Sequence, residues 1–330
     1  MNIGFVVNQF HKETPAYTTS GLALQASRMG HEVYYISVGD FSYTHDERMG
    51  ALARRLPEKG FRNTSTLLEA LKQTEKIKIT SSDLDVILLR NDPAADMGKR
   101  PWAQNAGIVF GQLAQQQNVL VLNDPYALSM ASNKMYFQYF PKEVRPATII
   151  TRDIADITHF FKENNSKIIL KPLQGSGGKN VFIVDKKDTK NLNQIVEAIS
   201  RDGFVVAQEY LPAAKDGDIR VFLIDGEPIV IKGHMAAIHR HQKEGDIRSN
   251  IHAGGHATKA RITKNIKKII EQVTEKLKAD GMFLCGLDIV GDKLMEVNVF
   301  SPGGLYHACE LYNVDFYEPV ITAIEKKLDR

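Results

Sequence analysis

Three side chains with oxygen donors stand close together late in the sequence: Asp288, Glu296 and Asn298. Glu296 and Asn298 are two residues apart on an expected strand, so their side chains lie on one face of it. Carboxylate and amide oxygens form the donor set that suits Mg²⁺ or Mn²⁺ beside nucleotide phosphates. The alternative is a solvated hairpin with incidental acids. Carboxylates among apolar strand residues usually have a partner, so the pattern favours a metal site.

The length of the hairpin connection decides whether Asp288 and Glu296 lie on the same face of the sheet. A two-residue turn at Gly291–Asp292 would set Asp288 opposite Met295 and leave Glu296 on the other face of the sheet. For Asp288 and Glu296 to meet one metal ion, the connection must contain an odd number of residues. Three is the simplest such number.

A glycine-rich segment from Lys171 to Gly178 lies between two expected strands. It does not match the P-loop pattern, because no Gly-Lys-Ser/Thr opens a helix there, and Asn180 stands where the dinucleotide fingerprint needs its last glycine. Such a loop exposes backbone N–H groups to phosphate oxygens, and Lys171 could add positive charge. The motif fits a hairpin turn that needs glycine for positive φ equally well.

A third segment, Gln208–Pro212, runs from a strand end into a loop and is followed by Arg220. A strand edge there could bind an adenine through backbone hydrogen bonds, and the Arg220 guanidinium could donate to a phosphoryl oxygen. Acidic turns before strands are common, so this segment has meaning only together with its neighbours.

The elements that must position these residues fall into two sets. The first third of the chain alternates strands and helices, which predicts a parallel sheet with helices on both faces. Later strands pair as hairpins, one of them around Asp225–Gly226. The expected strands are 3–7, 33–37, 84–89, 119–122, 147–151, 167–172, 181–185, 204–209, 220–224, 228–232, 283–290 and 293–298, and the expected helices 21–29, 154–162, 192–199, 262–277 and 317–328. We expect surface helix and loop over 44–79 and a flexible, polar segment over 234–256.

Length and composition limit the number of domains and the class of protein. At roughly 150 residues per domain, 330 residues predict about two domains or three smaller lobes, and 43% hydrophobic with 25% charged residues excludes wholesale disorder. A net charge of +3 argues against nucleic acid or a membrane surface as partner. No apolar run has membrane-spanning length, and Met1–Phe10 lacks the features of a signal peptide, so we expect a cytoplasmic protein. Two cysteines cannot build a disulfide framework.

Taken together, these motifs resemble in order and spacing the prokaryotic-type glutathione synthetases of the ATP-grasp superfamily. The segments that carry the resemblance are 85–93, 132–134, 171–178, 208–220, 248–255, 286–288 and 296–302. The resemblance covers nearly the whole chain, and the joint pattern is far more specific than any single piece.

The resemblance implies an α/β protein, α+β in its C-terminal part, with the ATP-grasp fold and an N-terminal parallel-sheet lobe. Its lobes would be 1–124, 125–205 and 206–330, with a lid at about 239–255 and ATP between two antiparallel sheets. The implied activity joins γ-glutamylcysteine to glycine with ATP through an acyl phosphate, which makes glutathione. Small-molecule substrates and a homo-oligomer are also implied.

The resemblance also assigns roles by position. ATP contacts fall on Lys134, Lys171, Gly175, Ser176, Gly177, Gly178, Gln208, Glu209, Tyr210, Leu211 and Asp218. Two Mg²⁺ or Mn²⁺ ions would be held by Asp288, Glu296 and Asn298. The reacting carboxylate would meet Arg220, Arg248 and Asn250, and the substrates Arg90, Asp92, Ser301, Gly303 and Gly304.

The sequence departs from the family where the substrates should bind. Gly303-Gly304-Leu305 replaces a bulkier, charged loop, and residues beside Asp92 and after the first strand also differ. A related ligase that joins an amino acid to a different peptide or protein acceptor is therefore the alternative. A non-catalytic nucleotide-binding protein is less favoured because no metal ligand or arginine is lost. A nicotinamide oxidoreductase is disfavoured because no glycine fingerprint follows the first strand.

Overall fold

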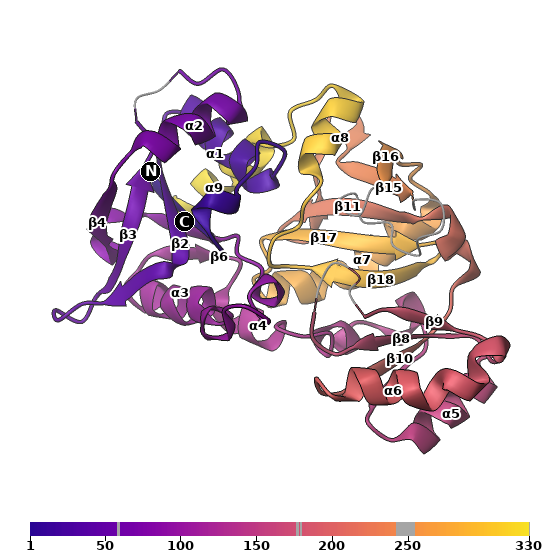
Figure 1. The fold of residues 1–330 in the computed structure, drawn as a ribbon. Coiled ribbons are helices and arrows are strands. Elements are labelled where there is room, and N and C mark those ends of the chain that lie inside the picture. The colour runs from indigo at the N-terminus through magenta and orange to yellow at the C-terminus, as the bar shows by residue number, and fades with distance from the viewer. Residues whose placement is uncertain (58–59, 176–177, 179, 242–254, 330) are drawn as a thin grey trace.

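The computed structural model describes residues 1–57, 60–175, 178, 180–241 and 255–329. Within these residues the strands form a six-stranded sheet, a four-stranded sheet, a second six-stranded sheet and a two-stranded ribbon. Figure 1 shows the first sheet at one end of the molecule and the other two large sheets together at the opposite end. The fold is mixed α/β, with parallel pairing only in the first sheet.

The helices and strands are bounded as follows. The helices are α1 Thr18–Arg28, α2 Thr64–Gln73, α3 Ala106–Gln116, α4 Pro125–Met130, α5 Ile154–Glu163, α6 Leu192–Ser200, α7 Lys264–Ala279, α8 Leu305–Tyr312 and α9 Glu318–Leu328. The strands are β1 Asn2–Val7, β2 Glu32–Tyr43, β3 Met49–Arg55, β4 Lys76–Thr80, β5 Val86–Leu89, β6 Leu120–Leu122, β7 Thr148–Thr151, β8 Ile168–Pro172, β9 Phe182–Val184, β10 Val205–Glu209, β11 Asp218–Ile224, β12 Glu227–Pro228, β13 Val230–Ile231, β14 His234–Met235, β15 Ala237–His241, β16 His256–Lys259, β17 Leu284–Val290 and β18 Lys293–Asn298.

The first sheet has the order β4-β3-β2-β1-β5-β6, and its β2, β1, β5 and β6 run parallel as expected. Helices cover both faces of this sheet. Phe5 of β1 packs in one core with Leu22 of α1, while its neighbour Val6 packs in another core with Ile108 of α3. Successive residues of a strand point to opposite faces, so β1 is apolar along most of its length.

The expectation of surface helix and loop over 44–79 is wrong in part. This segment holds β3, α2 and the edge strand β4, and Met49 and Ala53 of β3 are fully buried. Glycine and alanine give β3 little intrinsic strand preference, so its conformation depends on pairing with β2 and β4. Lysines alternate with isoleucines in β4, a pattern that suits an edge strand.

The second sheet has the order β7-β10-β8-β9 and is antiparallel throughout. The amphipathic helices α5 and α6 cover one face, where Phe160 and Ile199 pack against Leu170 and Val205. Figure 1 shows both helices on the side of this sheet away from β17 and β18. The other face is therefore available to line a site.

The third sheet has the order β16-β15-β11-β17-β18, with β12 beside β11 and α7 packed on one face. Its β11–β12 hairpin has the expected Asp225–Gly226 loop, in which both residues have positive φ. The segment 234–256 is not wholly flexible, because β15 pairs with β11 and Ala237 and Ile238 are fully buried. The expected lid of 239–255 thus includes three strand residues at its start.

Helix α9 closes the core of the first lobe. Its Val320, Ile321 and Ile324 are fully buried in the same core as Leu22 of α1. Figure 1 accordingly shows the final, yellow helix beside the indigo N-terminal elements. Among the residues described, no helix combines the length and apolar character needed to cross a membrane.

Candidate active site

A cavity of about 760 Å³ opens between the second and third sheets and extends to the first lobe. It brings together most residues that the sequence singled out: Arg90, Asp92, Lys134, Lys171, Gly175, Gly178, Gln208, Tyr210, Leu211, Asp218, Arg220, Asp288, Glu296, Asn298, Ser301, Gly303 and Gly304. Glu209 does not line it, and its carboxylate instead accepts a hydrogen bond from the Ala147 N–H. The expected Ser176, Gly177, Arg248 and Asn250 lie outside the described residues.

A bulge in the β17–β18 pair aligns the acidic residues. The turn is the two-residue Gly291–Asp292, because Val290 pairs with Lys293, and a three-residue connection is therefore not used. The register shifts one step later, so that Asp288 pairs with Glu296 and Met295 is left as the extra residue. The bulge supplies the odd residue that the register argument required.

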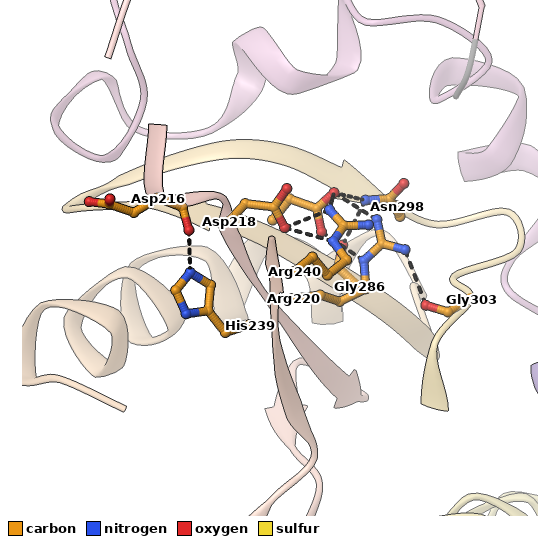
Figure 2. A network of polar contacts seen from close by, with 9 residues as sticks. Asp216, Asp218, Arg220, His239, Arg240, Gly286, Asn298 and Gly303 are labelled. Atoms are coloured by element: carbon orange, nitrogen blue, oxygen red, sulfur yellow. Dashed lines mark hydrogen bonds and ion pairs between the residues drawn. The ribbon is translucent and has the colours of Figure 1, made fainter. Parts of the chain in front are cut away.

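Asp288 lies at the centre of a charged network with Arg220, Arg240 and Asn298. Figure 2 shows the side chains of these three partners converging. Arg220 holds both carboxylate oxygens, with Nε 2.7 Å from Oδ1 and Nη2 2.6 Å from Oδ2. Arg240 Nη2 lies 2.8 Å from the same Oδ2, and the Asn298 amide donates to it at 3.1 Å. Burial alone would raise the pKa of Asp288, but the two arginines outweigh it and lower this pKa to about 2.

Arg240 is a site residue that the sequence analysis missed. It lies on β15, opposite Asp218 of β11, and its Nε donates to the Asp218 Oδ1 at 2.7 Å. Burial favours the neutral form of Arg240, but Asp288 and Asp218 raise its pKa above the usual value. The sequence pattern that could have identified it is the spacing of two residues between Ile238 and Arg240. In a strand, this spacing places both side chains on one face.

The three predicted metal ligands have free donor capacity. The Glu296 side chain is exposed to the cavity, and Asn298 uses its Nδ2 group, which leaves its amide oxygen as an acceptor. The Oδ1 atom of Asp288 accepts from Arg220, and a carboxylate oxygen can accept twice. No cluster of three His, Cys, Asp or Glu side chains suited to a metal occurs in the described part of the chain, so a three-donor site here needs the Asn298 amide oxygen beside the two carboxylates. This oxygen set fits a divalent cation.

Two lysines face the acids across the cavity. The Lys171 Nζ donates to the Gln208 Oε1 at 2.9 Å, and the Lys134 Nζ donates to the Gly175 carbonyl at 2.7 Å. Burial lowers the pKa of Lys171 to about 8, with Glu296 opposing the shift, and it also lowers the pKa of Lys134. Cations that are desolvated in this way gain most from a polyanionic ligand.

The segment expected at an adenine lies at the end of β10. Gln208 is fully buried and donates to the Thr148 Oγ1 at 3.1 Å while accepting from Lys171. Tyr210 lies beyond the strand, with the Lys167 Nζ 4.0 Å from its ring centroid. Gln208 thus fixes the half-buried Lys171, and Tyr210 and Leu211 line the cavity further out.

Two arginines support the loop that bounds the substrate end. Arg90 Nη2 donates to the Pro302 carbonyl at 3.1 Å, and Arg220 Nη1 donates to the next carbonyl, that of Gly303, at 3.1 Å. Gly304 has a φ of +103°, which glycine adopts readily, and α8 begins directly after it. The loop therefore ties the first lobe to the charged network.

The chain is similar to known proteins over nearly its whole length. Residues 1–129 match the model for the prokaryotic glutathione synthetase N-terminal domain, and 133–313 match the prokaryotic glutathione synthetase ATP-grasp domain. The chain is 33% identical to the glutathione synthetase of Escherichia coli O157:H7 over 94% of this chain and 93% of that protein. It is 32% identical to the glutathione synthetase of Salmonella typhimurium over 99% of both chains.

Solved structures agree on the fold. The D-cycloserine synthetase DcsG superposes with a TM-score of 0.68 at 12% identity, over 99% of both chains. The ATP-grasp ligase PsnB, complexed with a minimal precursor, Mg and ADP, superposes with a TM-score of 0.60 at 16% identity, over 99% of this chain and 98% of that one. The protein therefore has the ATP-grasp fold and belongs to the prokaryotic glutathione synthetase family, whose members are ATP-dependent ligases that use a divalent metal ion and form a carbon–nitrogen bond.

Proposed function

We propose that this protein makes glutathione by joining the cysteinyl carboxylate of γ-glutamylcysteine to the amine of glycine at the expense of ATP. The observation that carries the proposal is one cavity in which the Arg220–Asp288 pair, two half-buried lysines and three oxygen donors meet the first lobe. The match to glutathione synthetases over nearly the whole chain supports this choice of substrates.

The reaction needs an activated carboxylate, because an oxide leaving group is too basic for an amine to expel. The donor carboxylate oxygen attacks the γ-phosphorus of ATP, the bond to the β-phosphate oxygen breaks, and ADP leaves. The amine nitrogen of glycine then attacks the carbonyl carbon of the acyl phosphate. The carbon–oxygen bond breaks, phosphate departs, and the amine gives up a proton.

The chain's own residues bind and orient the reactants. Lys134 and Lys171 bind the phosphates of ATP, with Gly175, Ser176, Gly177 and Gly178 over them. Gln208, Glu209, Tyr210 and Leu211 frame the adenine, and Asp218 lies beside the nucleotide. Arg220, with Arg248 and Asn250, binds the reacting carboxylate and stabilises the oxyanion that develops on it.

Asp288, Glu296 and Asn298 would hold the metal. We propose two Mg²⁺ or Mn²⁺ ions, because three separate protein donors leave most coordination positions of each ion for phosphate oxygens and water. When bound, the ions neutralise charge that builds up on the transferred phosphoryl group. Arg220 meanwhile keeps Asp288 ionised, as the lowered pKa of this carboxyl indicates.

The remaining assignments follow the lobes. Arg90, Asp92, Ser301, Gly303 and Gly304 contact the substrates at the junction of the first lobe with the third sheet. We also propose that the chain has three lobes, 1–124, 125–205 and 206–330. A homo-oligomer formed through the first lobe is a further proposal. The mass of the protein in solution, measured by light scattering after size-exclusion chromatography, tests the oligomer.

A direct assay tests the proposed function. Purified protein with ATP, Mg²⁺, γ-glutamylcysteine and glycine should release phosphate and yield a product with the mass of glutathione. Omitting glycine is the control, since the amide product needs both substrates. If another carboxylate and amine support phosphate release and this pair does not, the proposed substrates are wrong.

One observation favours a second candidate, a ligase with a larger acceptor. A Cβ atom built at Gly303, which lines the cavity, would have no heavy atom within 4 Å other than those of Gly303 and its two chain neighbours. This open space beside the Arg220 contact would admit a bulkier amine than glycine. Replacing glycine by short peptides with free amino termini in the same assay distinguishes the two candidates.

A further inference from the structure

Two opposite charges lie near one another at the first-lobe end of the cavity without touching. Glu13 and Arg90 both line this end, yet their side chains form no ion pair with one another. Glu13 is half-buried in the loop before α1, and Arg90 is only 6% exposed. Each group feels the charge of the other without a direct contact, so this arrangement suits a ligand that brings an opposite charge into contact with each of them.

Two buried polar atoms of residues that line the cavity lack a hydrogen-bond partner. The Glu13 Oε2 and the Thr18 Oγ1 are buried without a hydrogen-bond partner, and Thr18 is only 2% exposed. Both are acceptors, and Thr18 lines the cavity at the first turn of α1. An acidic acceptor and a hydroxyl acceptor that line one cavity can together receive an ammonium group.

Arg90 provides the complementary half. Its Nε donates to the Thr19 Oγ1 at 3.3 Å and its Nη2 to the Pro302 carbonyl at 3.1 Å. A guanidinium has five N–H donors, so these two bonds leave the others for a ligand. A carboxylate is the group that matches a guanidinium best, because two of its N–H groups can bind both oxygens.

We infer that Glu13, Thr18 and Arg90 form a subsite for a zwitterionic α-amino-acid head group, with its ammonium at Glu13 and Thr18 and its carboxylate at Arg90. The inference deepens the proposed function and rests on it, since the γ-glutamyl end of the carboxylate donor is such a head group. The other end of the donor then reaches Arg220, which holds the carbonyl next to the one that Arg90 holds.

The electrostatics of the empty subsite agree with this geometry. Burial raises the pKa of Glu13 to about 7, although Arg90 opposes the shift, and burial lowers the pKa of Arg90 to about 10. An ammonium placed beside Glu13 favours its ionised form. Binding of the zwitterion near pH 7 should therefore release part of a proton from Glu13.

The experiment compares two ligands and two variants by titration calorimetry. The ligands are γ-glutamylcysteine and glutarylcysteine, which keeps the terminal carboxylate and lacks only the ammonium group. The variants are Glu13→Gln and, as a matched control, Glu69→Gln, which removes an exposed charge from α2 of the same lobe. Thermal unfolding of each variant verifies that it is folded.

We expect the unmodified protein to bind γ-glutamylcysteine at least ~10-fold more tightly than glutarylcysteine, the ratio that corresponds to about 1.4 kcal/mol. Glu13→Gln should remove most of this preference by weakening the first ligand only, and Glu69→Gln should preserve it. In buffers of different ionisation enthalpy at pH 7, proton release should accompany binding to the unmodified protein and vanish in Glu13→Gln. Equal weakening of both ligands, or no weakening, would overturn the inference.

Phosphate release separates this inference from the proposed function. Glu13-dependent binding of γ-glutamylcysteine without phosphate release supports the subsite and overturns the proposed reaction. If the protein releases phosphate with γ-glutamylcysteine and Glu13→Gln does not change the KM for this substrate, the subsite is wrong and the proposed reaction is supported. If the protein neither binds γ-glutamylcysteine nor releases phosphate, both the subsite and the proposed reaction are wrong.

Discussion

Arg220 and Asp288 face each other across the β11–β17 pair, and the guanidinium contacts both oxygens of the carboxylate. The same pairing orients Arg220 toward the Gly303 carbonyl and keeps Asp288 ionised. In the proposed function, this one strand register therefore places both the anion that binds the metal and the cation that binds the reacting carboxylate.

Glu296→Gln should lower the rate of phosphate release on the order of 100-fold or more, because a negative metal ligand becomes a neutral one. Titration with Mn²⁺ in the presence of ATP, followed by the electron paramagnetic resonance of the free ion, should show weaker metal binding. Asp292→Asn, an exposed change in the adjoining turn, is the control and should alter neither quantity. Unchanged metal affinity in Glu296→Gln would remove this residue from the metal site.

Arg240→Met should lower the free energy of unfolding by about 3–5 kcal/mol, because two buried carboxylates, Asp218 and Asp288, lose a partner. Arg201→Met, which removes an exposed pair with Glu197, should cost less than about 1 kcal/mol. Urea denaturation at pH 7 measures both values. Equal small losses would mean that Arg240 does not support the network.

The affinity for ATP should fall above about pH 8, because Lys171 must be protonated to bind phosphate and burial holds its pKa near 8. Below that pH the dissociation constant should be flat, and above it the constant should rise about tenfold per unit. Lys171→Arg should keep the constant flat up to pH 9, because its guanidinium stays charged. Calorimetric titration with ATP and Mg²⁺, without the other substrates, gives the profile, and identical profiles would contradict it.

Glu13→Gln should stabilise the free protein at pH 8 more than at pH 4.5. Since burial raises the Glu13 pKa to about 7, the folded state binds this proton more tightly than the unfolded state, and stability is lost as the pH rises between 4.5 and 7. The expected difference is on the order of 1–3 kcal/mol. Urea denaturation of both proteins at the two pH values measures it, and a difference that does not change with pH would count against the burial effect.

The local sequence pattern predicted much of the fold, and the pairing of strands explains the elements that it missed. The strands β1, β5 and β6 follow from short apolar runs that end in polar turns. The strands β3 and β4 were missed because small residues and lysines carry little strand signal until β3 pairs with β2 and β4 pairs with β3. For the acidic site, the parity argument was right about the faces of Asp288 and Glu296, but the device is a bulge rather than a longer turn.

The residues that sequence reasoning missed are defined by tertiary contacts. Arg240 lies in a polar, histidine-rich stretch, and its value as a partner arises only when β15 joins β11. Glu13 lies in a loop, and it shares a cavity end with Arg90 because β1 and β5 run side by side. The predicted contributions of Arg248 and Asn250 fall on undescribed residues and stay predictions.

The placement of α9 affects how the protein can be synthesised. Because Val320 and Ile321 share one core with Leu22 of α1, and this core also contains Phe222 of β11, the first lobe cannot finish folding on the ribosome before nearly all the rest of the chain has emerged. A nascent chain that stops after residue 313 would leave the apolar face around Leu22 open to chaperones and proteases. Quality control in the cell can thus sense a truncation near the carboxyl end through a defect in the lobe made first.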